Sequence, residues 1–113
     1  MTGRESLARL EARQDEERAA ARRRLEAADE TLQLYRREIR RVQEAFYEHA
    51  EQRGVGGDPG FRSGFQRVLE HSDDQLRAGQ NVVDEQAEDL DAMVRPQDDE
   101  REDFIAEQRI HTR

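Results

Sequence analysis

The histidines at positions 49, 71 and 111 are the side chains of this chain best suited to bind a metal ion or to titrate near neutral pH. His49 and His71 both lie near the middle of the sequence, so a shared metal site is one interpretation. Two ligands without an obvious third make a poor zinc site, because zinc needs three or four protein ligands. The chain has no Cys to supply a thiolate. We therefore expect solvated histidines, no metal and no cofactor.

Carboxylates are abundant, and paired carboxylates can catalyse hydrolysis where a concave pocket separates their pKa values. The acidic run at 98–103 lacks the Gly and the spacing of oxygen ligands found in a calcium-binding loop. No phosphate-binding loop, nucleophile elbow or dinucleotide fingerprint occurs in the sequence. We expect no catalytic residues, no small-molecule substrate and no enzymatic activity.

Arginines cluster at 22–24 and 36–41, which suggests either a nucleic-acid or phospholipid surface or ion pairs within the chain or with a partner. Acidic residues are interleaved with these clusters. Residues 84–113 hold eleven acidic side chains and four arginines, and the net charge is −8. An acidic balance disfavours nucleic acid and anionic membranes. Ion pairs are therefore the favoured interpretation, with no nucleic acid and no membrane as partner.

The composition requires an unusual fold, since only 34% of the residues are apolar and 41% are charged. Such a chain is either disordered or helical with a narrow apolar seam. Helix-forming residues dominate, and there are only two prolines and seven glycines. The composition together with the periodicity described next predicts an all-α protein.

A turn is indicated in the middle of the chain, where residues 54–60 hold four of the glycines and one proline. The sequence has 53 residues on each side of this segment. Two equal arms around one short turn predict a single domain that folds as a long antiparallel two-helix hairpin.

The first arm carries an unbroken apolar repeat with spacings of four and three residues, which is the heptad pattern of a left-handed coiled coil. It predicts a helix over 6–53. The repeat consists of Ala21, Leu25, Ala28, Leu32, Tyr35, Ile39, Val42 and Phe46.

The second arm carries apolar residues every seven positions, with polar Gln97 in the fifth place, between Leu90 and Phe104. Pro96 removes a backbone donor and clashes with the preceding turn, so we expect a helix over 61–95, a kink, and a short helix over 97–110. In a hairpin closed at 54–60, paired residue numbers add up to about 114. Tyr35 then lies opposite Gly79, and the polar break at Gln14 and Arg18 lies opposite Pro96 and Glu100.

The predicted seam, along which either the two arms or a partner helix would pack, contains thirteen residues. They are Leu25, Leu32, Tyr35, Ile39, Val42, Phe46, Phe61, Phe65, Leu69, Leu76, Val83, Leu90 and Phe104. The aromatic residues near the turn, including Tyr47, suggest either a plug that pins the end of the hairpin or an exposed docking tip.

The equal arms, the absence of Cys and the Gly-rich turn flanked by aromatics resemble the small helical-hairpin proteins of bacterial type VII secretion. These include WXG-type proteins and the small partner proteins of LXG toxins. The Trp-x-Gly turn of the family is replaced by 54–60. The Tyr-x-x-x-Asp/Glu spacing of its export signal occurs only at Tyr47–Glu51, before the turn rather than after the second helix. The resemblance implies a partner or targeting chaperone that accompanies an effector, rather than an independently exported protein.

These observations favour a non-enzymatic adaptor or chaperone that binds helices of a larger protein. The alternatives are a self-associating coiled coil, as in a dimeric four-helix bundle, and a stalk component of a secretion machine. The first residues contain no apolar signal-peptide region, and no apolar run approaches the roughly 20 residues of a membrane span. We expect a soluble cytoplasmic protein, with export alongside a partner as an open alternative.

Overall fold

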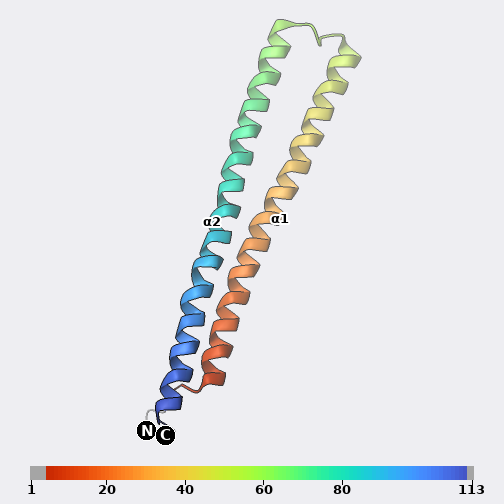
Figure 1. Ribbon diagram of the computed structural model, residues 1–113. Coiled ribbons are helices and arrows are strands. Elements are labelled where there is room, and N and C mark those ends of the chain that lie inside the picture. Colours follow the sequence, from red (N-terminus) through yellow and green to blue (C-terminus); the bar gives the residue numbers. More distant parts are fainter. Residues whose placement is uncertain (1–4, 112–113) are drawn as a thin grey trace. The chain divides into compact units, whose positions relative to one another are not determined.

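The computed structural model describes residues 5–111, which form two α-helices and no strand. Helix α1 comprises Leu7–Arg53 and helix α2 comprises Pro59–His111. A short turn at 54–58 joins them (Figure 1). The predicted fold class, an all-α two-helix hairpin, is confirmed.

Both ends of α1 are defined by local hydrogen bonds. At its start, the hydroxyl of Ser6 accepts a bond from the backbone N–H of Arg9 at 3.2 Å, as an N-cap does. At its end, Gly54 adopts a φ of 65°, and the N–H of Val55 donates to the carbonyl of Ala50 at 3.1 Å. This is the Schellman arrangement, in which a residue with positive φ ends the helix. The predicted first arm therefore matches α1, with Ser6 as its cap.

Helix α2 begins two residues earlier than predicted, at Pro59 rather than residue 61. Proline suits the first position of a helix because its fixed φ is helical and its missing N–H has no partner there in any case. The carboxylate of Asp58 accepts a bond from the N–H of Phe61 at 2.9 Å and caps the helix. The turn is correspondingly shorter than predicted.

The expectation that α2 ends near Arg95 and restarts at residue 97 is wrong, because α2 continues through Pro96. Proline deprives the carbonyl one turn earlier of its donor. Side chains of α1 donate to two backbone carbonyls on either side of Pro96: Arg18 to that of Val94 at 3.2 Å, and Gln14 to that of Gln97 at 3.1 Å. These bonds tie α2 to α1 just before and just after the proline, although neither reaches the carbonyl of Ala92, which loses its donor.

The described residues divide into two compact units. Unit 1 combines residues 5–26 of the first arm with residues 84–111 of the second, and unit 2 contains residues 27–83. In unit 2 the turn makes the two helical segments antiparallel. In unit 1 the segments are antiparallel as well, since Gln14 bonds Glu100 while Arg18 bonds Val94.

Within each unit the most buried apolar side chains all belong to α1. Leu10 and Ala21, each 2% exposed, form the centre of unit 1. Leu32 at 3%, Ile39 at 9% and Ala50 at 8% do so in unit 2. Because few side chains are fully buried, most of the apolar seam is only half-covered.

The heptad repeat does not hold near the turn. Val42 is 37% exposed, whereas Gln43 is half-buried in its place. From Ala28 to Ala50 the contacting stripe therefore advances by two 11-residue repeats, close to the 3.6 residues per turn of a straight α-helix. Over this stretch, the left-handed heptad geometry predicted from the sequence is replaced by a longer repeat.

The glycine in the middle of α2 has a packing role, but with a different neighbour from the one predicted. A Cβ atom on Gly79 would lie 2.9 Å from Cδ1 of Leu32, so Leu32 rather than Tyr35 occupies the space that the glycine leaves. The alignment of the two helices is therefore shifted by three residues, because the contacting residues 32 and 79 add up to 111 rather than to the predicted value of about 114.

Candidate partner-binding face

One side of unit 2 is bridged between its two helices. The guanidinium of Arg36 donates to the side-chain oxygen of Gln80 at 3.2 Å. Farther along, the ring of Tyr47 packs edge-on against Phe65 with centroids 5.1 Å apart. Arg36 and Tyr47 are 11 residues apart and therefore lie on the same side of α1. These contacts cover that side of the apolar seam.

The other side of unit 2 contains two apolar hollows. The larger has a volume of about 560 Å³ and lies between α1 and α2, where small side chains keep the surface low. It is lined by Ala27, Ala28, Thr31, Leu32, Tyr35, Gln75, Ala78, Gly79 and Val82.

The second hollow, of about 510 Å³, lies nearer the turn. It is lined by Val42, Ala45, Phe46, His49 and Phe61. On α1, the lining residues of the two hollows recur at intervals of three, four or seven residues, so they share one side of the helix. We call the residues that line the two hollows the open face.

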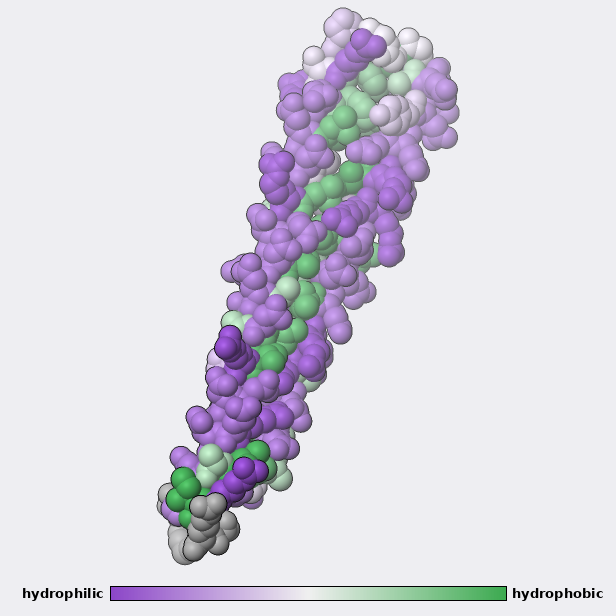
Figure 2. All heavy atoms as spheres, in the orientation of Figure 1, coloured by the Kyte–Doolittle hydropathy of each residue, from purple (hydrophilic) through white to green (hydrophobic). Residues whose placement is uncertain are grey.

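The open face exposes large apolar side chains to solvent. Val82 is 48% exposed and Val42 is 37% exposed. Figure 2 shows apolar side chains reaching the surface between hydrophilic flanks over unit 2. Ligand pockets for small molecules place several polar groups around an enclosed cavity. The larger hollow instead offers Thr31 and Gln75 among apolar side chains, which suits the ridge of another helix.

The aromatic residues near the turn form one cluster. Phe46 lies 6.0 Å from Phe61 and 5.3 Å from Phe65 between ring centroids, and Phe61 is 6.3 Å from Phe65. These contacts join the end of α1 to the start of α2, as expected for a plug. The alternative of a docking tip also retains support, since Tyr47 is 62% exposed and Phe46 and Phe61 border the second hollow.

The thirteen predicted seam residues are distributed over both units. Leu32 and Ile39 are buried, Val42 is exposed, and the other ten are half-buried. Leu25, Leu90 and Phe104 belong to unit 1. Only seam residues that border a hollow of unit 2 can meet a partner there directly. The predicted residues that do so are Leu32, Tyr35, Val42, Phe46 and Phe61.

Most of the open face was absent from the predicted seam. Its remaining members, apart from Val82, are small or polar, and their signal is a set of alanines beside the heptad positions, at 27 and 45 of α1 and at 78 of α2. Ala28 belonged to the heptad repeat itself. The buried polar residues Gln14 and Gln97 were seen only as interruptions of the seam, although they are 0% and 7% exposed.

The charge on unit 2 is nearly balanced. Residues 27–83 hold ten acidic side chains and eight arginines, whereas the rest of the chain holds seventeen and eleven. In the basic cluster at 36–41, Arg36 bonds Gln80 and Arg41 pairs with Glu38 at 3.1 Å. The arginines at 22–24 are exposed. Association through unit 2 therefore meets less charge repulsion than association through unit 1.

His49 borders the second hollow and His71 is exposed. In the part of the chain that the structure describes, no group of three or more His, Asp or Glu side chains is arranged to hold a metal ion. Between residues 5 and 111, neither helix combines the length and apolar character needed to cross a membrane.

Fold and surface together define the class of protein: an all-α helical hairpin with an apolar face on unit 2. No protein-family model, curated protein or solved structure matches the chain.

Proposed function

We propose that the protein is a helix-binding module, an adaptor or chaperone that binds a helix of a larger protein on the open face of unit 2. The observation that carries this proposal is the pair of apolar hollows on the unbridged side of the helix pair. A partner helix laid along this side would bury Val42 and Val82 and complete a three-helix core.

The shallow burial within each unit supports a protein that gains stability from association. Among the described residues, the buried apolar side chains are Leu10 and Ala21 in unit 1 and Leu32, Ile39 and Ala50 in unit 2. A helix pair has one inner seam, so each unit leaves apolar surface that a third or fourth helix could cover. Binding that is specific to the folded state stabilises that state by mass action.

A second copy of the chain is the other candidate occupant of the open face, giving a dimeric four-helix bundle. The near balance of ten acidic side chains and eight arginines in unit 2 favours this alternative, because two such surfaces repel each other little. The face also combines the small residues Ala78 and Gly79 with the larger Tyr35 and Val82, which suits a self-complementary interface.

The narrower proposal concerns the pathway. The resemblance to the small hairpin proteins of type VII secretion suggests that the partner is the helical domain of a secreted effector, which the protein would accompany as a targeting or accessory factor. A gene for a long LXG-type toxin next to this one would support it.

Substituting Ala78 with Arg tests the open face, because the long charged side chain would fill the larger hollow while keeping a good helix former. The matched control is Ala106→Arg, at an exposed position of α2 in unit 1. Affinity capture from the native host should recover a helical partner with the wild-type protein and the control, and lose it with Ala78→Arg. Equal recovery with all three proteins would contradict the proposal.

Light scattering separates the two occupants. A mass of two chains for the wild-type protein and the control, but of one chain for Ala78→Arg, would assign the face to self-association. A single-chain mass for all three proteins, together with partner capture, would assign it to a different protein. The same face can be probed by a photo-crosslinking residue at Val82, which is 48% exposed.

A further inference from the structure

Unit 1 contains a buried polar layer where two apolar side chains would be expected. Gln14 is 0% exposed. Among the described residues, Gln14 and Leu10 are the largest fully buried side chains. Gln97 of α2 is 7% exposed and occupies the fifth place of the seven-residue apolar repeat, between Leu90 and Phe104. We call Gln14, Gln97, Arg18 and Arg101 the polar layer.

The amide of Gln14 is fully engaged by α2. Its Nε2 donates to the backbone carbonyl of Gln97 and to Oε2 of Glu100, both at 3.1 Å. Its Oε1 accepts a bond from Nε of Arg101. One side chain of α1 therefore contacts three residues of α2, through both its donor and its acceptor.

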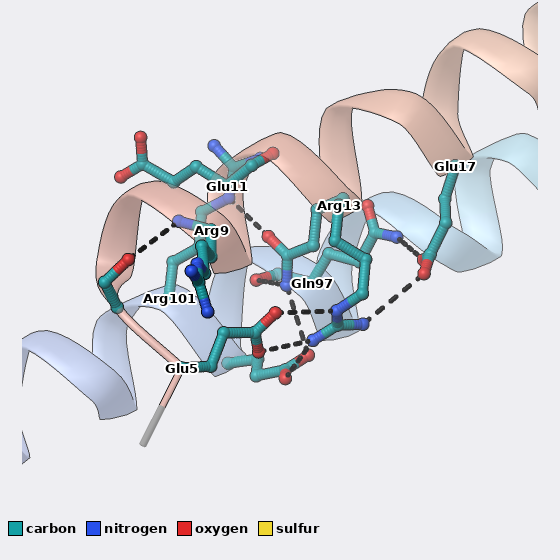
Figure 3. A network of polar contacts seen from close by, with 10 residues as sticks. Glu5, Arg9, Glu11, Arg13, Glu17, Gln97 and Arg101 are labelled. Carbon is teal, nitrogen blue, oxygen red and sulfur yellow. Dashed lines mark hydrogen bonds and ion pairs between the residues drawn. The ribbon is translucent and has the colours of Figure 1, made fainter. Parts of the chain in front are cut away.

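Gln97 makes the reciprocal set of bonds to α1. Its Oε1 accepts from Nε of Arg18 at 2.5 Å, and its Nε2 donates to Glu17 at 2.8 Å. Figure 3 shows Gln97 and Arg101 within the polar network at this end of α1. Within the described residues, no buried side-chain nitrogen or oxygen lacks a hydrogen-bond partner.

The two arginines close the layer at its edges. Arg18, whose side chain is 14% exposed, pairs with Asp98 at 2.7 Å. Arg101, whose side chain is 23% exposed, pairs with Asp15 at 2.8 Å and also donates to the carbonyl of Glu11 at 3.4 Å. The hydrogen bond that Arg101 donates to the carboxylate of Asp15 raises the pKa of Arg101, and desolvation opposes this shift. Both guanidinium groups thus join the two helices rather than pointing into water.

This arrangement has a consequence for which helices can pair in unit 1. An apolar seam alone accepts many apolar partners, because dispersion and burial are not directional. The polar layer accepts only a facing helix that offers acceptors and donors at the levels of Gln97, Glu100 and Arg101. Any other helix leaves two buried amides unpaired, which is strongly unfavourable.

We propose that the polar layer is a specificity element that restricts pairing in unit 1 to a first arm with a second arm, antiparallel and in this alignment. Single buried polar residues play this part in coiled coils, where they fix alignment and oligomeric state at some expense of stability. In this protein the element keeps unit 1 closed to other helices. It does not depend on the function proposed for unit 2.

The test replaces both amides by leucine, Gln14→Leu with Gln97→Leu, in the full chain. The seam of unit 1 then becomes continuous and apolar. We expect the melting temperature to stay equal or rise while selectivity is lost. At the same concentration, light scattering should show an increase of about twofold in average molar mass relative to the wild-type protein, as added dimers would give.

A distance measurement within one chain gives a second readout. The chain has no Cys, so spin labels can be placed at Ala12→Cys and Glu88→Cys, two exposed positions of unit 1. They lie at levels about 20 Å apart along the helices, at 1.5 Å per residue. The wild-type background should give one narrow distance distribution, and the leucine pair a broadened or divided one.

Leu10→Ala is the control for stability alone. It removes buried apolar contacts and should lower the melting temperature without changing the molar mass or the width of the distance distribution. If the leucine pair keeps both the mass and the narrow distribution of the wild-type protein, the proposal is overturned. Should the leucine pair fail to fold, Gln14→Met with Gln97→Met, whose side chains match glutamine more closely in length, provides the same comparison.

Discussion

Leu32 of α1 and Gly79 of α2 touch so closely that a Cβ atom on Gly79 would lie 2.9 Å from Cδ1 of Leu32. Glycine in the interior of a helix costs about 1 kcal/mol relative to alanine. The close approach is the packing reason for this glycine, and it lowers the surface beside the larger hollow of the open face.

The first prediction concerns Gly79→Ala. The substitution gains helix propensity but forces Leu32 out of its rotamer, at about 0.5–1.5 kcal/mol, so the two effects nearly cancel. Gly64→Ala is the matched control, because a Cβ there meets nothing within 4 Å, and it should raise the free energy of unfolding by about 1 kcal/mol. Urea denaturation followed by circular dichroism measures both. Equal stabilisation by the two variants would show that the contact with Leu32 is unimportant.

The second prediction concerns the end of α1. Gly54 has a φ of 65°, a conformation that costs a residue with a Cβ about 1–2 kcal/mol. Gly54→Ala should lower the free energy of unfolding by about that amount. Gly57→Ala, in the same turn but without a positive φ or a neighbour within 4 Å of its Cβ, should leave it unchanged or raise it slightly. The reverse order of the two variants would contradict the Schellman arrangement.

The third prediction concerns the cap of α2. Asp58→Ala removes the acceptor for the N–H of Phe61 and should lower the free energy of unfolding by about 1 kcal/mol. Asp58→Asn keeps an oxygen at the same position and should lie within a few tenths of a kcal/mol of the wild-type protein. Thermal denaturation of the wild-type protein and the two variants at equal concentration measures these differences in stability. A loss as large for Asn as for Ala would assign the effect to charge instead of to the cap.

The fourth prediction concerns the aromatic contact on the bridged side of unit 2. Tyr47 and Phe65 lie 5.1 Å apart in an edge-on geometry, with planes at 72°. Such pairs contribute about 0.5–1.5 kcal/mol beyond the area that they bury. A double-mutant cycle with Tyr47→Ala and Phe65→Ala should return a coupling free energy in that range. A coupling near zero would mean that the pair contributes no more than its two separate burials.

The helices and the turn follow from short-range chemistry and could be predicted from the sequence. Gly54 can adopt a positive φ, and Asp58 followed by Pro59 caps and begins a helix. The prediction of the start of α2 failed by two residues because Pro59 was taken as part of the turn, although proline is favoured at the first helical position. Pro96 was taken as a break because proline lacks a backbone donor, whereas α2 continues through it and is tied to the other arm on both sides.

The candidate face was predicted only in part. The heptad pattern located Leu32, Tyr35 and Phe46, but no local pattern distinguishes an alanine that lines a hollow from one that faces water. That distinction depends on which side of the helix pair is bridged, by Arg36 with Gln80 and by Tyr47 with Phe65. Residues about 44 and 18 positions apart make these bridges, so the open side becomes visible only once the helices are paired.

Two helices joined by one turn follow from the sequence, because helix propensity, caps and glycine conformations act over a few residues. The burial of Gln14 and Gln97 in the core of unit 1 follows only from the pairing of the two arms. It depends on donors and acceptors supplied from residues some 80 positions away. The continuation of α2 through Pro96 is likewise visible only in the folded chain. From sequence alone, a glutamine is predicted to lie on the surface, because its burial requires hydrogen-bond partners that the sequence does not identify.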